Sequence, residues 1–454
     1  MKIKIKELDK YLSSIEVFEK LKEEGAIFLD SSKKDEKLSK YSFIGLNIIE
    51  KFEVRGETSY INDDKIAKKN PFEELEKRIK IYKIDIKSDI PLIGGYIGYI
   101  SYDTGRILEK IIDKSTQDID IPNMRFYLYE NIVVFDHLNE KMFITAIGEN
   151  ENRIDKSLID LEEKIFKGIK LENYKSTKES IEFKSNFTKE SYIETVKKMR
   201  NYIREGDIYI ANMTQRYISN CNKDGFSIYK NLRSINGAPF STYINYGDFE
   251  IISSSPERFI QVKEGLVHTR PIKGTRPRGK NKEEDNFYRN ELINSEKDKS
   301  ELLMIVDLER NDLSKVCEKG SVKVTELFKI EEYETVFHLV STIEGRLKEG
   351  VSSVRCIKEC FPGGSITGAP KIRAMEVIEE LEGLKRNLYT GSIGYFDLRG
   401  NSDFNIVIRT IVKKDNIAYF GVGGGVTYES LEEDEYYETL QKAKALMEAL
   451  RWEK

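Results

Sequence analysis

Two spacings of apolar residues distinguish the parts of the chain. Over residues 1–150, short runs rich in β-branched and aromatic residues, separated by glycines and polar turns, predict β-strands. The strands are expected at residues 26–29, 41–46, 94–100 and 131–136. Further along, apolar residues recur every three or four positions, which is the period of an amphipathic helix. The combination predicts an α+β fold with long mixed sheets.

Three later segments combine this helical period with signals for where a helix begins or ends. Thr188 is a suitable N-cap for the first helix, and Gly206 ends it. Pro370 begins the second helix and Gly383 ends it, while the third is expected over residues 432–450. The positions expected to face the interior are Ile193, Val196, Met199 and Ile203; Ile372, Met375, Ile378 and Leu381; and Leu440, Ala443, Met447 and Leu450.

Between the two kinds of pattern the chain is rich in Lys, Glu and Asn, with one weak helical period over residues 157–167. This composition is typical of a connection between two halves. We therefore predict a β-rich region over residues 1–150, a connecting segment over 151–184 and a catalytic region over 185–454.

Composition narrows the class of protein. The chain has 454 residues, of which 39% are hydrophobic and 33% charged, which is typical of a globular protein with a sizeable core. A formal net charge of −4 argues against nucleic-acid binding. Since no apolar run approaches the length of a membrane span and none resembles a signal peptide, we expect a cytoplasmic protein without membrane contact. The four cysteines are expected to be reduced and structural.

Residues 271–278, Pro-Ile-Lys-Gly-Thr-Arg-Pro-Arg, place Lys273 at a tight Gly-Thr turn. An amine attacks carbon only when it is neutral, and nearby cations disfavour a further positive charge. Arg270, Arg276 and Arg278 are therefore expected to surround Lys273 and to favour its neutral, nucleophilic form. The alternative is a solvated basic hairpin, which the spacing alone does not exclude.

Further unusual segments accompany this turn. They are Ser-Pro-Glu-Arg-Phe at residues 255–259, the acidic stretch 301–312, Phe-Pro-Gly-Gly-Ser-Ile-Thr-Gly-Ala-Pro-Lys at 361–371, 389–395, Ile-Arg-Thr at 408–410 and 423–430. In this order they resemble the motifs of the chorismate-utilising enzymes, the family of anthranilate synthase component I. The resemblance implies large mixed or antiparallel sheets sandwiched and flanked by helices, and an enzyme that acts on chorismate.

Two pairs of acidic residues suggest a metal site. Asp298 and Glu301, and likewise Glu435 and Glu438, stand three positions apart on expected helices, so each pair shares one helix face. Two such faces across a pocket can hold Mg2+ together with waters and a substrate carboxylate, although solvated helix surfaces give the same pattern. The resemblance implies that Glu301 and Glu438 are the Mg2+ ligands, with Glu435 and Asp298 in the outer shell.

The resemblance also implies roles in binding and catalysis. Arg409 offers a planar fork for a substrate carboxylate. Glu257 matches the family's general acid/base, for which an ion pair with Arg258 is the structural alternative. The remaining positions that match substrate contacts are Tyr389, Gly424 and Lys442 near the enolpyruvyl carboxylate, and Gly274, Thr275 and His338 near the ring.

Lys273 favours one reaction within the family. Members that make 4-amino-4-deoxychorismate carry Pro-Ile-Lys-Gly-Thr at this turn, whereas those that make anthranilate, isochorismate or salicylate resemble Pro-Ile-Ala-Gly-Thr. Ile210, where water-activating members use a lysine, argues against isochorismate and salicylate synthesis. The resemblance therefore implies amination of chorismate to 4-amino-4-deoxychorismate, with anthranilate and pyruvate as the alternative products.

The source of nitrogen is expected to lie outside the chain. No cysteine stands in the Gly-x-Cys-x-Gly turn of a glutamine amidotransferase. Ammonia is therefore expected from solution or from a separate glutaminase subunit, which is the usual partner in this family.

Overall fold

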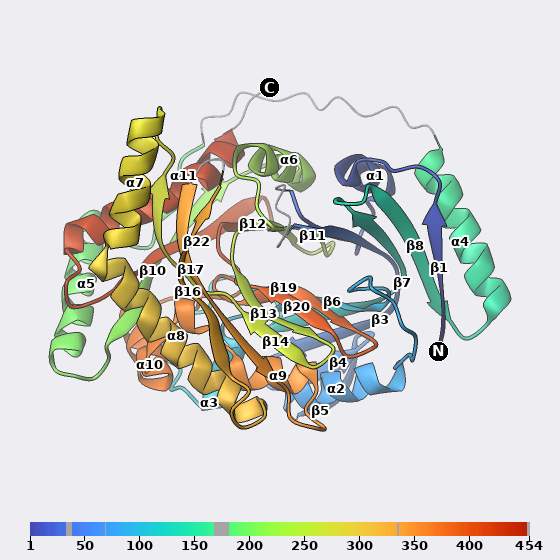
Figure 1. The fold of residues 1–454 in the computed structure, drawn as a ribbon, viewed down its shortest axis with the longest axis horizontal. Coiled ribbons are helices and arrows are strands. Elements are labelled where there is room, and N and C mark those ends of the chain that lie inside the picture. The colour runs from blue at the N-terminus through green and yellow to red at the C-terminus, as the bar shows by residue number, and fades with distance from the viewer. Residues whose placement is uncertain (33–38, 69, 168–180, 334–335, 452–454) are drawn as a thin grey trace.

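Strands dominate the first half of the chain (Figure 1). The computed structural model describes residues 1–32, 39–68, 70–167, 181–333 and 336–451. The strands of this half are β1 (Lys2–Leu8), β2 (Ile27–Asp30), β3 (Tyr41–Arg55), β4 (Thr58–Ile61), β5 (Asp64–Lys68), β6 (Gly95–Ile100), β7 (Met124–Asp136) and β8 (Lys141–Gly148). The helices are α1 (Ser14–Leu21), α2 (Pro71–Ile81), α3 (Thr104–Glu109) and α4 (Glu151–Phe166).

The second half alternates strands with longer helices. Its strands are β9 (Lys184–Ser185), β10 (Ile210–Asn220), β11 (Phe240–Asn245), β12 (Glu250–Ser255), β13 (Arg258–Lys263), β14 (Leu266–Thr269), β15 (Ile272–Pro277), β16 (Lys323–Glu332), β17 (Val336–Arg346), β18 (Gly368–Ala369), β19 (Ser392–Asp397), β20 (Ser402–Asn405), β21 (Thr410–Lys414) and β22 (Ile417–Val426). Its helices are α5 (Lys189–Arg204), α6 (Gly225–Ile235), α7 (Lys282–Asn294), α8 (Glu296–Val316), α9 (Ser353–Cys360), the short 3₁₀ helix η1 (Gly364–Ile366), α10 (Lys371–Glu382) and α11 (Glu432–Arg451).

Antiparallel ladders join the two halves into one network of strands. β2 pairs with β11, with Thr242 opposite Leu29, and β6 pairs with β19, with Gly394 opposite Gly98. Gly98 is required at this place, because a Cβ there would lie 1.9 Å from the carbonyl oxygen of Arg125. The halves therefore share sheets and not only a surface.

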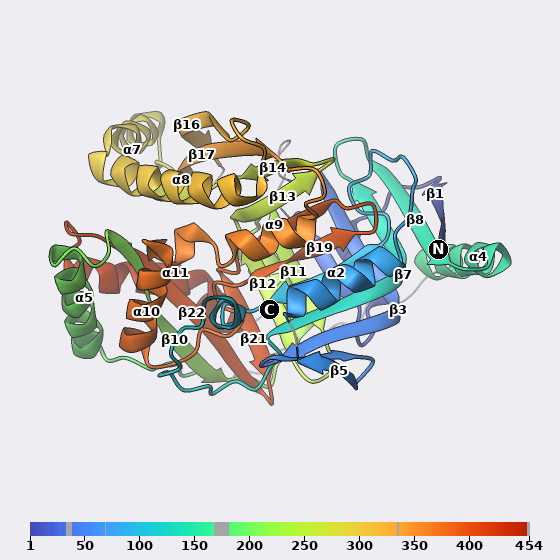
Figure 2. The ribbon, with the colours of Figure 1, turned by 90° about the horizontal axis from the view of Figure 1, so that it is seen from below.

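Helices cover the ends and faces of these sheets. In both ribbon views α5, α7, α8, α10 and α11 gather at one end of the molecule, while α4 lies at the opposite end (Figures 1 and 2). The largest apolar cluster crosses the boundary between the halves, since the ring of Phe126 packs against the rings of Phe396 and Phe404 at centroid distances of 5.6 and 6.1 Å. The α+β class with large antiparallel sheets and flanking helices is confirmed.

Several expected elements differ in extent. The expected strands at 41–46 and 131–136 are parts of the longer β3 and β7, and the weak helix at 157–167 begins already at Glu151. Asn150 caps it by accepting a hydrogen bond from the Asn152 amide, and its buried residues pack on β1 and β8. Residues 168–180 of the expected connection lie outside the described residues, and the three-part division stays a prediction.

The three expected helices are present as α5, α10 and α11. Thr188 caps α5 in a reciprocal capping box with Ser191. Gly383 ends α10 at a positive φ of 71°. One expected inward position is wrong: Ile372 is 49% exposed, because the buried face of α10 runs through Ala374, Val377 and Ile378.

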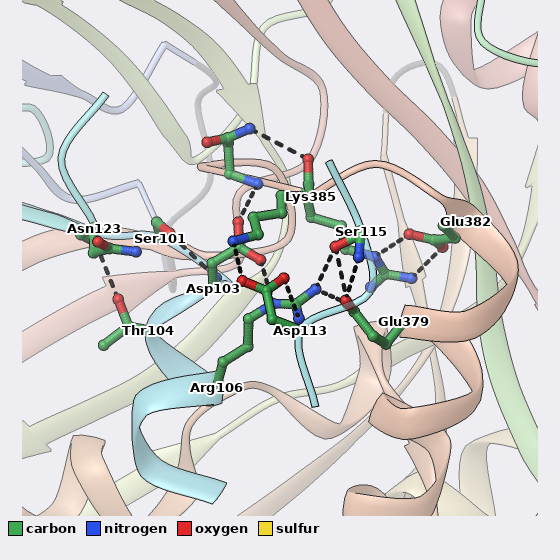
Figure 3. Close-up of polar contacts among 12 residues, drawn as sticks. Ser101, Asp103, Thr104, Arg106, Asp113, Ser115, Asn123, Glu379, Glu382 and Lys385 are labelled. Atoms are coloured by element: carbon green, nitrogen blue, oxygen red, sulfur yellow. Dashed lines mark hydrogen bonds and ion pairs between the residues drawn. The ribbon is translucent and has the colours of Figure 1, made fainter. Parts of the chain in front are cut away.

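A polar network fixes α10 to the first half of the chain (Figure 3). Arg106 of α3 pairs with Asp103 and Glu379, and the amides of Lys114 and Ser115 both donate to the Glu379 carboxylate. In the same last turn of α10, Glu382 holds the buried Arg386 through two hydrogen bonds. Arg386 in turn donates to the carbonyl oxygens of Asn212 and Ile366, which line the cavity described below. The network thus supports the wall of that cavity.

All four cysteines are buried, and none is joined by a disulfide to another described residue. Within the described residues, no helix is both long enough and apolar enough to cross a membrane.

Candidate active site

A cavity of about 900 Å3 opens between β15, β17, β22, α8 and α11. Every site residue predicted from the sequence lines this cavity except Gly424 and Glu435. These two lie directly behind it, since a Cβ on Gly424 would be 2.9 Å from Glu435 Oε2 and 3.1 Å from Glu438 Oε1. Segments that are distant in the sequence therefore meet at one site.

Lys273 lies on β15, next to an irregularity in the pairing of that strand with β17. Gly274 adopts a positive φ of 78°, which lets the strand turn without steric strain. Lys273 Nζ donates to the carbonyl oxygen of Ser365 over 3.0 Å. A Cβ on Gly425 would come within 3.4 Å of Lys273 Nζ, so the glycine leaves room beside the amine.

The expected cluster of free arginines around Lys273 is wrong. Arg270 pairs with Glu326 and Glu331, Arg276 with Glu291 and Asp298, and Arg278 with Asp285. Each guanidinium is thus neutralised by a carboxylate. The charges that act on the neighbourhood of Lys273 are instead the carboxylates Glu257, Glu301 and Glu438. The sequence could not reveal this, because the pairing carboxylates come from other elements.

Glu257 follows the end of β12 and is almost fully buried. Burial raises the pKa of this carboxyl, and the Ser365 hydroxyl and the charge of Lys273 offset only part of the effect. The structural alternative of an ion pair with Arg258 is not found, because Arg258 binds Asp403 with two hydrogen bonds of 2.9 and 3.0 Å. A buried carboxyl with a raised pKa suits a proton donor.

The two acidic pairs lie on α8 and α11 and face each other across the cavity. Burial raises the pKa of Glu301, and it raises the pKa of Glu435 to about 7 with a contribution from the neighbouring Glu438. Burial acts in the same direction on Glu438, but Lys442 Nζ at 2.5 Å outweighs it and holds the pKa of Glu438 below its usual value. Asp298 is paired with Arg276 at 3.0 Å, in keeping with an outer position.

The acidic pairs fit a divalent cation in one respect. Glu301 Oε1 and Glu435 Oε2 are buried and accept no hydrogen bond. Buried carboxylate oxygens without a partner are costly, and a hard cation satisfies them. In the described parts of the chain, no three metal-ligating side chains converge into a site that could hold an ion unaided. Ligands from water and substrate would therefore have to complete the shell.

Arg409 is the strongest candidate for binding a substrate carboxylate. Its backbone is left-handed, with φ of 53°, and its Nη1 donates to the carbonyl oxygen of Lys442 over 2.7 Å. Within the residues that the structure describes, Arg409 forms no ion pair, and burial lowers the pKa of its guanidinium. A desolvated cation that faces a cavity without a counter-ion is a receptor for an anion.

The other residues predicted to contact the substrate also lie at this cavity. Thr275 Oγ1 lies 2.8 Å from His338 Nδ1, because β15 and β17 place these residues opposite each other. Tyr389 lines the cavity, and burial raises the pKa of its hydroxyl. Lys442 is engaged with Glu438 and with the carbonyl oxygen of Gly423 at 2.8 Å.

Sequence reasoning missed two charged groups near the site. Lys297 lines the cavity one helical turn before Glu301, and the spacing of the two residues was an available signal. Glu309 is buried behind Glu257, where it accepts a hydrogen bond from Thr269 Oγ1 over 2.9 Å, and burial raises its pKa to about 8. The signal for Glu309 was its place on the apolar face of α8, four residues after Ile305.

Comparison with known proteins identifies the class. The family model described as chorismate binding enzyme matches residues 24–448. Aminodeoxychorismate synthase component 1 of Bacillus subtilis (strain 168) is 38% identical, over 90% of this chain and 89% of its own length. Anthranilate synthase component 1 of Aquifex aeolicus (strain VF5) is 36% identical, over 96% of this chain and 92% of its own length. The chain belongs to the chorismate-binding enzyme family.

The fold agrees with a solved relative. The crystal structure of anthranilate synthase component I from Streptococcus pneumoniae TIGR4 is similar with a TM-score of 0.83 and 32% identity, covering 91% of this chain and 93% of that one. The expected anthranilate synthase component I fold is thereby confirmed.

Proposed function

We propose that this protein aminates chorismate at C4 to give 4-amino-4-deoxychorismate, with Mg2+ bound by Glu301 and Glu438 and ammonia supplied by a separate glutaminase subunit. The observation that carries the proposal is Lys273, whose Nζ projects into the cavity beside Gly425 and opposite the acidic groups. The similarity to aminodeoxychorismate synthase component 1 of Bacillus subtilis supports it.

The residues support a two-step displacement. The amine of Lys273, in its deprotonated form, attacks C2 of chorismate while both ring double bonds shift and the C4 hydroxyl leaves as water, taking the proton of Glu257. Ammonia then attacks C4, both double bonds shift back and the lysine amine leaves C2. A proton lost by the attacking ammonia returns to Glu257, so the net reaction consumes chorismate and ammonia and yields the aminated product and water.

The other groups at the cavity bind chorismate and orient it toward Lys273 and Glu257. Arg409 holds one substrate carboxylate in a bidentate contact, and the backbone around Gly423 approaches the second. A bound Mg2+ would neutralise a substrate carboxylate against Glu301 and Glu438. Thr275 and His338 bound the ring side of the cavity.

Product analysis tests the proposal against anthranilate synthesis. Purified protein, chorismate, Mg2+ and ammonium chloride should yield a product that an added aminodeoxychorismate lyase converts to 4-aminobenzoate. A lactate dehydrogenase assay should detect no pyruvate before the lyase is added. Stoichiometric pyruvate together with anthranilate fluorescence would establish the alternative reaction.

The same assay tests the source of nitrogen. Glutamine should support turnover only when a separate glutaminase subunit is added, whereas ammonium salts should suffice at elevated pH, where free ammonia rises. Glutamine hydrolysis by the isolated chain would refute the two-subunit arrangement.

A further inference from the structure

Lys297 lies between the two helices that carry the acidic pairs. It stands in the first turn of α8, and its Nζ is 3.9 Å from Glu301 Oε1 and 3.8 Å from Glu435 Oε1 of α11. Its side chain is 44% exposed and lines the cavity, whereas the side chains of Glu301 and Glu435 are only 10% and 3% exposed. A solvent-accessible cation thus faces two buried anions from different elements.

These contacts neutralise charge, but Lys297 donates a hydrogen bond to neither carboxylate; Glu435 Oε1 accepts its hydrogen bond from Ser430 Oγ over 2.6 Å. Distances of 3.8 and 3.9 Å exceed hydrogen-bond length, and Glu301 Oε1 and Glu435 Oε2 accept no hydrogen bond. Two buried carboxylates repel each other unless a cation lies nearby. Lys297 therefore reduces their repulsion but leaves coordination sites open.

We propose that Lys297 is a displaceable counter-ion, which holds the carboxylates of Glu301 and Glu435 together before the metal binds and competes with Mg2+ for the same negative potential. The inference rests on the magnesium site of the proposed function. Lysine suits the role because its compact charge sits on a flexible four-carbon stem, so it can swing toward solvent when a divalent cation enters.

Two consequences follow. Mg2+ must displace or repel a positive charge, so Lys297 lowers the affinity of the site for the metal. Without Mg2+, the same lysine stabilises the two helices against the repulsion of their carboxylates. Removal of the charge should therefore strengthen metal binding and weaken the metal-free protein.

The test compares Lys297→Met with Lys297→Arg and with Lys299→Met. Lys299→Met is a matched control, because it removes the same charge from the same helix. Lys299 does not line the cavity, and its Nζ contacts Glu296 at 3.3 Å. After treatment with EDTA and dialysis, Mg2+ alone is titrated into each protein by calorimetry. The melting temperature is recorded with and without Mg2+. If Lys297→Met does not fold, Lys297→Gln takes its place.

Lys297→Met should bind Mg2+ about tenfold more tightly than the unaltered protein, which is the order of change expected for one charge near 4 Å in a partly buried site. Without Mg2+, Lys297→Met should also melt at a lower temperature than the unaltered protein. Addition of Mg2+ should raise its melting temperature by more than it raises that of the unaltered protein. Lys297→Arg and Lys299→Met should stay within about threefold of the unaltered affinity.

Equal Mg2+ affinity in Lys297→Met and Lys299→Met would overturn the inference while leaving the magnesium site intact. Weaker Mg2+ binding in Lys297→Met would overturn it as well. Absence of Mg2+ binding in the unaltered protein would overturn the magnesium assignment itself, and the inference with it.

Discussion

At the scale of residues, the site combines groups whose protonation is set by burial. Glu257 and Glu309 are buried carboxyls with raised pKa values, while Lys442 holds the pKa of Glu438 down. The difference between Glu257 and Glu438 suits the proposed chemistry, because a proton donor must be neutral and a metal ligand must be ionised. Burial raises the pKa of the second proposed ligand, Glu301, so a bound cation would have to favour its ionised form. The residues that matched family motifs were predictable from the sequence, whereas the neutralisation of Arg270, Arg276 and Arg278 was not.

Glu257→Gln should reduce kcat by about 100-fold or more, because an amide cannot protonate the leaving hydroxyl, while KM for chorismate changes little. Since burial raises the pKa of Glu257, the active protonated form is lost as pH rises through that value, and kcat should fall on this limb. Rates are measured at a fixed concentration of free ammonia. The limb should be absent in Glu257→Gln.

Glu264→Gln is the matched control, since Glu264 is exposed at the turn after β13. If Glu257→Gln keeps more than about a tenth of the unaltered kcat, as the control should, Glu257 is not the proton donor. Such a rate corresponds to a loss of less than about 1.4 kcal/mol of transition-state stabilisation.

Among the helices and strands, the periodic patterns predicted which elements exist better than they predicted where each element begins and ends. Strand β3 continues past its predicted end at residue 46. The pattern did not show this, because Asn47 has a positive φ of 57° and the pairing with β7 shifts between Ile48 and Glu50, which breaks the alternation of buried positions. Similarly, the first turn of α4 is polar and charged, so the apolar period did not show that the helix begins at Glu151. Local irregularities set by pairing partners do not show in a periodic pattern.

The buried carboxyl of Glu309 on α8 should make the stability of the protein depend on pH. The pKa of Glu309 is about 8 in the folded protein and near 4.5 when unfolded, so the native state holds the extra proton between these values. Stability should therefore fall as pH rises from about 5 to 8, by on the order of 3 to 4 kcal/mol. Glu309→Gln lacks the titrating group and should not show this fall.

The measurement is the melting temperature of both proteins from pH 5 to 9. Glu309→Gln should become increasingly more stable than the unaltered protein toward pH 8, with Glu318→Gln, at an exposed position after α8, as the control. A constant difference across this range would show that Glu309 does not carry the proton.

At the scale of the whole molecule, the shared sheets connect the two halves. The pairs β2 with β11 and β6 with β19 span them, and the network around Arg106 and Glu379 fixes α10 to the first half. Motifs predicted which residues meet at the cavity, because the family resemblance contains that information. They did not predict that the first half supports its wall, since no local pattern records pairing between distant strands.

Residues 185–454 should not fold alone, because β11 and β19 would lose their partners and expose open edges, and Phe396 and Phe404 would lose their contact with Phe126. Circular dichroism and limited proteolysis should show an unfolded or aggregated fragment. Co-expression with residues 1–184 should restore a protected complex. A stable, protease-resistant fragment would show that the halves are independent.

Rapid-quench mass spectrometry can show whether Lys273 forms a covalent bond to the substrate, as the proposed two-step displacement requires. During turnover with chorismate, Mg2+ and ammonia, intact-mass and peptide analysis should detect an adduct on the peptide containing Lys273, and should detect none in Lys273→Ala. Lys273→Ala should also lose far more in kcat than in chorismate affinity, because the carboxylate contacts remain. Full kcat and the same product in Lys273→Ala, with no adduct in the unaltered protein, would contradict the account and leave direct attack of ammonia at C4.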